Sequence, residues 1–161
     1  MKPIFLAAFL AVISGQAHAL SCMRPDPIMT FKQVAAAPEN YFVLYGELTF
    51  DEDLLPDTST DIRERAVDPI PGQFRGKGLT RNGFTSDYIS PVNLEIGCVG
   101  PWCGSARSGG DALYFVQATD VPVTMIAGAC GGMIFPEPSQ AVLDMLTSCM
   151  QGGACSSQSL Q

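Results

Sequence analysis

The sequence predicts a mainly β protein, a small antiparallel β-barrel with a short helix at each end, held together by disulfides. Three observations favour this fold class. Short stretches rich in branched and aromatic residues recur along the chain, separated by Gly, Pro or Asn. Helical patterns occur only near the two ends of residues 20–155, and the six cysteines form an even set. A sandwich of two sheets is the alternative arrangement of the same strands.

The first predicted elements are a helix, a strand and a loop. Residues 30–37 ("TFKQVAAA") have a helical pattern, with Thr30 as the N-cap and Pro38 just beyond the end. Residues 41–50 ("YFVLYGELTF") form the clearest strand, and Gly46 within it predicts a bulge or a sharp bend. Residues 51–71 are charged and rich in turn-forming residues, so we expect a long exposed loop.

The second half of the chain predicts further strands and a closing helix. Successive antiparallel strands are expected at 72–81, 84–91, 92–98, 112–120 and 121–130. Residues 138–150 are helical, since Val142, Met145, Leu146, Cys149 and Met150 recur at helical spacing. Gly152 and Gly153 end that helix, and residues 156–161 predict a flexible tail.

The first nineteen residues are typical of an export signal, with Lys2, an apolar stretch and the cleavage pattern Ala17-His18-Ala19. The apolar stretch is shorter than the ~20 residues of a membrane-spanning helix. We therefore expect a single domain over residues 20–155, exported to a periplasmic or extracellular space, with no membrane span. Lipid attachment at Cys22 is the alternative. Against it, Leu20 stands one place too late for the usual attachment motif, and removing Cys22 from pairing would leave an odd number of cysteines, five.

Charge and histidine content exclude several functions. The whole chain carries −7, and the signal removes one further positive charge, Lys2. Nucleic-acid binding needs a basic surface, so it is not expected. His18 is the only histidine and lies in the signal, so the mature chain has no imidazole for Ser-His-Asp or Cys-His catalysis or for zinc ligation. No cofactor is expected.

An even number of cysteines in an exported chain is typical of a disulfide framework. Short sequence separation favours Cys98–Cys103 and Cys149–Cys155, which leaves Cys22–Cys130. Sequence alone does not choose among the possible pairings.

The stretch 98–104 ("CVGPWCG") separates two cysteines by four residues. A redox pair usually has two intervening residues at a helix N-terminus, and zinc would need two more ligands, so a structural disulfide is favoured. We expect Trp102 to pack over that disulfide, with an exposed aromatic as the alternative.

The order of these features resembles the netrin-like module, whose best-known members are the tissue inhibitors of metalloproteinases. The resemblance rests on Cys22, the stretch "FVLYGEL", Cys103-Gly104, the strand with "LYFV", Cys130 and a closing helix. It implies an OB-type barrel with the N-terminal cysteine tied to the later strands. In the inhibitors a first-position cysteine presents its amine and carbonyl to the protease zinc. Here Leu20 and Ser21 precede Cys22, which does not match that arrangement.

Other chemistries stay open as alternatives. Asp87, Glu95, Asp111 and Asp120 lie in or near strands and could form a hydrolytic carboxylate pair. Asp51, Asp53, Asp57 and Asp61 offer oxygen ligands for calcium, but they lack the glycine and glutamate of an EF-hand loop. Ser105 and Ser108 imitate a nucleophile loop, and the only candidate bases are Lys32 and Lys77.

We therefore expect a non-enzymatic module that binds a protein partner. By analogy to the inhibitors, its binding face would combine Leu20, Ser21, Cys22, Met23 and Arg24 with Pro101 and Trp102. A metalloprotease inhibitor, if the mature chain begins at Cys22, and a small carboxylate-dependent hydrolase are the alternatives.

Overall fold

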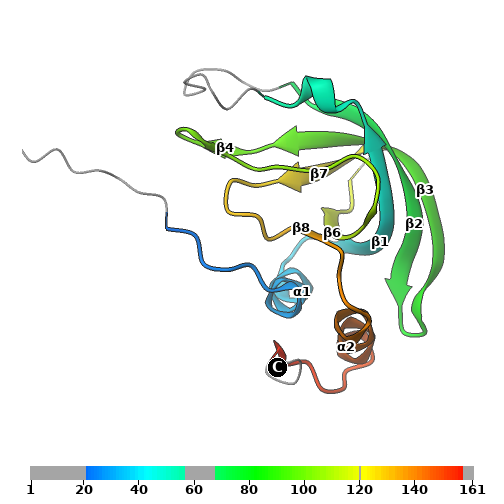
Figure 1. Cartoon of the computed structure of the whole chain (residues 1–161). Coiled ribbons are helices and arrows are strands. Elements are labelled where there is room, and N and C mark those ends of the chain that lie inside the picture. Colours follow the sequence, from blue (N-terminus) through cyan, green and yellow to red (C-terminus); the bar gives the residue numbers. More distant parts are fainter. Residues whose placement is uncertain (1–20, 57–67, 120, 158–161) are drawn as a thin grey trace, which may run out of the picture.

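The computed structural model describes residues 21–56, 68–119 and 121–157, which form a curled sheet with two helices packed on one side (Figure 1). The predicted signal, Leu20, Asp57, Asp61 and Asp120 lie outside these residues, as do most of the predicted loop and the end of the predicted tail. The sheet has six strands in the order β7-β3-β2-β1-β6-β8. They are β1 (Tyr41–Phe50), β2 (Ile70–Thr80), β3 (Gly83–Ile96), β6 (Asp111–Gln117), β7 (Val123–Ala127) and β8 (Ile134–Pro136).

The strand connections form a Greek key. β1, β2 and β3 are successive antiparallel neighbours, and β6 returns to pair with the other edge of β1. β7 then pairs with β3 in parallel, so the sheet is not antiparallel throughout, and β8 adds to β6. The curled sheet makes a half-barrel, and the predicted mainly β, disulfide-linked fold is confirmed.

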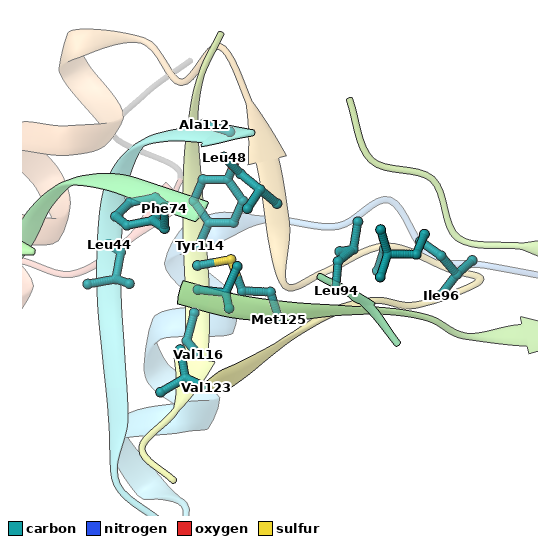
Figure 2. Close-up of a cluster of buried hydrophobic side chains, with 13 residues drawn as sticks. Leu44, Leu48, Phe74, Leu94, Ile96, Ala112, Tyr114, Val116, Val123 and Met125 are labelled. Atoms are coloured by element: carbon teal, nitrogen blue, oxygen red, sulfur yellow. The ribbon is translucent and has the colours of Figure 1, made fainter. Parts of the chain in front are cut away.

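The main hydrophobic core fills the inside of the curled sheet (Figure 2). The fully buried Phe74 ring meets the Tyr114 ring edge to face, with centroids 5.3 Å apart. Leu44 and Leu48 contribute from β1, and Met125 from β7. Strands from both ends of the sheet, β6 and β7 among them, therefore contribute to one core, and this shared core curls the sheet.

A second core lies between the outer face of the sheet and the helices α1 (Pro27–Ala36) and α2 (Gln140–Met150). Leu113 and Phe115 point to this side while Tyr114 points inward, so β6 is buried on both faces. Leu143 and Leu146 are the buried residues of α2. The periodicity of that helix included Leu146 and missed Leu143.

Several local predictions need correction. The N-cap of α1 is Asp26, whose carboxylate accepts from the N–H groups of Ile28 and Met29. The hydroxyl of Thr30 instead donates to the carbonyl of Gly132 at 3.0 Å. The two strands predicted at 84–91 and 92–98 are one strand, β3, which runs through Pro91.

Gly46 does not form a bulge, because β1 keeps continuous register with both of its neighbours. The bulge lies in β2, between Gly78 and Leu79. A Cβ on Gly46 would lie 2.4 Å from the carbonyl oxygen of Arg75, so glycine permits a close approach of β1 and β2. A short 3-10 helix, Glu52–Leu54, follows β1, so part of the predicted loop is ordered.

All six cysteines are paired, as Cys22–Cys130, Cys98–Cys103 and Cys149–Cys155. This is the pairing that short separation favoured. Cys149–Cys155 closes the segment after α2, while Cys22–Cys130 joins the N-terminal segment to the loop after β7 across 108 residues of sequence.

Candidate functional site

The motif "CVGPWCG" forms a minimal β-hairpin. β4 (Cys98–Val99) and β5 (Trp102–Cys103) pair so that the two cysteines stand directly opposite each other, and Gly100 supplies a positive φ at the turn. The disulfide joins the paired residues, which agrees with a structural role. Because every cysteine is in a disulfide, no thiolate is left as a zinc ligand or a redox nucleophile.

The hairpin is attached to the end of β7 through Gly97, and Gly104 bonds back to Gly97. Gly97 donates to the carbonyl of Ala127 at 2.9 Å, and Gly104 donates to the carbonyl of Gly97 at 2.8 Å. A Cβ on Gly104 would lie 1.9 Å from the Ala127 carbonyl oxygen, a distance that no side chain permits. Glycine at 104 is therefore a condition for seating the hairpin against β7.

The N-terminal segment is attached to the same region. Cys22 is bonded to Cys130, and the ring of Pro25 lies 3.2 Å from the position of a Cβ on Gly131. The N-terminal segment and the hairpin project to the same side of the molecule, with residues 127–131 between their attachment points (Figure 1).

We call residues 21–24 and 98–103 together the tip surface. It displays Met23, Val99 and Trp102, whose side chains are 90%, 52% and 45% exposed. The prediction that Trp102 packs over the disulfide is wrong, and the alternative, an exposed aromatic, is what the structure has. Ser21, Cys22, Arg24 and Pro101 are exposed on the same surface.

A groove of about 900 Å³ lies beside the tip surface and begins at Cys103. One wall is the loop 104–110, another is the segment 127–131 after β7, and a third is β8. Ala112 and Tyr114 of β6 also line it. The walls are mostly glycine, alanine and serine, and the groove is hollow because these residues fill little space. Its charged lining residues are Arg107, Asp111 and Glu137.

The loop 104–110 is fixed to the end of β1. The Ser108 hydroxyl accepts from the N–H of Phe50 at 2.9 Å, and the Ser108 N–H donates to the Glu52 carboxylate at 2.6 Å. Gly109 donates to the carbonyl of Leu48 at 2.8 Å. Ser108 therefore positions the groove wall. Ser105 lines the groove and is exposed.

Two tyrosines close to the groove have altered acidity. Burial, the main cause, raises the pKa of Tyr114 to about 12, and the nearby carboxylates of Asp111 and Glu47 add to it. A backbone hydrogen bond at Leu48 acts in the opposite direction. Burial also raises the pKa of Tyr45, whose hydroxyl donates to the Asp111 carboxylate at 3.3 Å. Both phenols therefore stay protonated and neutral near pH 7.

The candidate catalytic carboxylates are not brought together as pairs. Asp87 on β3 forms an ion pair with Lys77 on β2. Glu95 stands opposite Ile126, and Asp111 stands opposite Glu47 on β1. None of these three has another of the three as its register partner. The second candidate base, Lys32, is exposed on α1.

Of the four candidate calcium ligands, only Asp51 and Asp53 lie within the described residues. The Asp51 carboxylate caps the 3-10 helix by accepting from the N–H of Asp53 at 3.1 Å. Within the described ranges, no group of three or more His, Cys, Asp or Glu side chains is arranged to hold a metal ion. No helix among the described residues is long and apolar enough to cross a membrane.

Comparisons with protein-family models, with curated proteins and with solved structures found no match to this chain. The groove was not predicted from the sequence, although its loop carries a visible signal. The stretch 104–112 ("GSARSGGDA") consists almost entirely of small residues, which is typical of close backbone approach and of open space beside it.

Proposed function

We propose that this chain is an exported, non-enzymatic binding module that captures a protein partner with its tip surface. The observation that carries the proposal is the exposure of Met23, Val99 and Trp102 on segments that two disulfides hold in place. Exposed apolar side chains on fixed segments are candidates for contact with a partner, and tryptophan is enriched among the residues that dominate binding energy.

The disulfides support the same proposal in a second way. A surface that is fixed before binding loses less conformational entropy when the partner arrives. Here the Cys98–Cys103 disulfide limits the hairpin, and Cys22–Cys130 limits the N-terminal segment. Three disulfides are also typical of an oxidising compartment, which supports export to a periplasmic or extracellular space.

Two features support a relationship to the netrin-like module. The β6-β1-β2-β3 order is a Greek key with a fifth strand added at β3, and a partly open five-stranded Greek-key barrel is the OB-type architecture. The N-terminal cysteine is bonded to a loop of the later barrel, as the resemblance implies.

Site-specific photo-crosslinking in the producing cells tests the proposal. A photoreactive phenylalanine analogue replaces Val99 or Trp102, and the matched control replaces Ile89, which is 63% exposed on β3 outside the tip surface. We expect a discrete crosslinked protein from positions 99 and 102 and none from 89. The proposal is refuted if none of the positions crosslinks, or if position 89 gives the same product.

Metalloprotease inhibition is a second candidate, favoured by one observation. Cys22 is exposed and bonded to the barrel through Cys130, as a zinc-chelating cysteine would have to be. N-terminal sequencing of the exported protein decides between the two. A start at Cys22 together with inhibition of a zinc endopeptidase would establish this candidate, and a start at Leu20 without inhibition would remove it.

A further inference from the structure

The groove beside the tip surface has a strand edge along one wall. β8 is the last strand of the sheet, and among the described residues β6 is its only neighbour. Glu137 donates to the carbonyl of Asp111 at 3.0 Å, and Phe115 donates to the carbonyl of Met133 at 2.9 Å. Residues 133, 135 and 137 therefore direct their backbone groups toward β6. Because these directions alternate along a strand, Ile134 and Pro136 direct theirs away from β6.

The two residues with outward backbone groups, Ile134 and Pro136, are also the β8 residues that line the groove. Ile134 offers one N–H and one carbonyl, while Pro136 offers only a carbonyl. Among the described residues, no backbone or side-chain hydrogen bond reaches these outward groups. Proline on an edge shortens the stretch over which another strand can pair. The groove thus presents a short row of hydrogen-bonding positions rather than a full open edge.

The opposite walls leave room for a backbone. Residues 127–131 are alanine and glycine apart from Cys130, and Gly110 has nothing within 4 Å of where its Cβ would be. The volume of about 900 Å³ falls within the range of ligand pockets in proteins. A chain in extended conformation needs such a channel, with an edge on one side and small residues on the other.

The charges around the groove are unbalanced. Asp111 and Glu137 line it, and Glu47 stands opposite Asp111 on the neighbouring strand, while Arg107 is the one cation among its lining residues. Glu137 also has a φ of 48°, an uncommon conformation for a residue with a side chain, and it is held there by the bond to Asp111. The resulting field favours a cationic group at the Asp111–Glu137 end.

We infer that this groove is a binding site for an extended peptide segment that carries a basic side chain. The segment pairs with the outward backbone groups of Ile134 and Pro136, and its lysine or arginine lies at the acidic end of the groove, near Asp111 and Glu137. This site is separate from the proposed role of the tip surface, since its contacts are made by β8 and by residues 104–112 and 127–131. Failure of one proposal therefore leaves the other standing.

The inference is tested by measuring how pools of peptides bind to the purified, fully oxidised protein. The probes are acetylated and amidated peptides of about six residues, roughly 20 Å when extended. Their central position is fixed as lysine, glutamate or norleucine, and the other positions are randomised. We expect the lysine pool to bind and the glutamate pool not to bind. The best single lysine peptide should lose about tenfold or more in affinity when alternate backbone amides are N-methylated, because each blocked hydrogen bond contributes about 1 kcal/mol.

Variants place the binding within the groove. Ala129→Trp should abolish binding by filling the channel, whereas Ala35→Trp, at an exposed position on α1, should leave it unchanged. If Ala129→Trp does not fold, Asp111→Asn provides the second variant and should remove the preference for lysine over norleucine. The inference is overturned if no pool binds at a peptide concentration of about 1 mM, since a Kd of that size corresponds to only about 4 kcal/mol of binding free energy. It also fails if N-methylation has no effect, or if neither groove variant changes binding.

Discussion

Removal of the Cys22–Cys130 disulfide should destabilise the protein more than removal of either other disulfide. The perturbation is the double variant Cys22→Ser/Cys130→Ser. This bond spans 108 residues of sequence, against 5 for Cys98–Cys103 and 6 for Cys149–Cys155. Cross-linking a long loop restricts the unfolded chain more than cross-linking a short one.

The chain-entropy relation converts these separations into free energies of unfolding. The long loop corresponds to about 4.8 kcal/mol at 25 °C, and each short loop to about 2 kcal/mol. Losing about 4.8 kcal/mol would remove much of the roughly 5–15 kcal/mol by which a domain is usually stable. We therefore expect the Cys22/Cys130 variant to be marginally folded, while the two short-loop variants stay folded.

Urea denaturation, followed by far-ultraviolet circular dichroism, measures the three double variants against the wild type. The variants should rank with Cys22→Ser/Cys130→Ser the least stable, by about 2–3 kcal/mol relative to the other two. Equal losses in all three variants, or a larger loss for Cys98→Ser/Cys103→Ser, would refute the idea that loop length sets the contribution of each bond.

Three further outcomes follow from the contacts described above. The free energy of unfolding should fall as pH rises from 10 toward 12, because Tyr114 has a pKa of about 12 in the folded protein and so loses its proton more readily in the unfolded chain. In urea titrations across this pH range, Tyr114→Phe should show a shallower fall. Gly104→Ala should lower the free energy of unfolding by roughly 1–3 kcal/mol or more, since its Cβ would lie 1.9 Å from the Ala127 carbonyl oxygen. The control Gly78→Ala, whose Cβ would have its nearest contact at 3.7 Å, should unfold at a urea concentration close to that of the wild type. Asp26→Ala removes the α1 cap and should lower the free energy of unfolding by about 1 kcal/mol in the same assay; no change would mean that the cap is formed by another group.

The elements with strong local patterns were predictable from the sequence. The strand predicted at 41–50 is β1, Tyr41–Phe50, because most of its ten residues are branched or aromatic, which leaves little ambiguity. The second helix was found through its periodicity. The start of α1 was misplaced because Asp26 and Thr30 are both good N-cap residues, and the fixed φ of Pro27 favours the earlier start.

Features that depend on long-range pairing were not predictable. Pro91 was taken to separate two strands, yet it lies inside β3, one residue before β7 begins to pair at Val92. Up to that point β3 has a neighbour on one side only, and an edge strand tolerates proline. The parallel pairing of β3 with β7 has no local signal, since periodicity shows that a strand exists and not which strand it pairs with.

The candidate site also has a part that the sequence indicated and a part that depends on long-range pairing. A binding face of residues 20–24 with Pro101 and Trp102 was predicted by analogy to the inhibitors, and the structure attaches the described part of both segments to residues 127–131. The groove arises where β8 and the end of β7 meet the loop 104–110, which only the folded chain brings together. Its small residues were visible in the sequence, but their common location was not.

The central claim is that an exported chain holds its N-terminal segment and its hairpin on one disulfide-fixed surface. Mass mapping of the exported protein, without reduction, tests this claim most directly. The expected result is a mature chain beginning at Leu20, with no free thiols and with Cys22 joined to Cys130 and Cys98 to Cys103. Free thiols at Cys98 and Cys103, or a Cys22 bonded elsewhere, would contradict it.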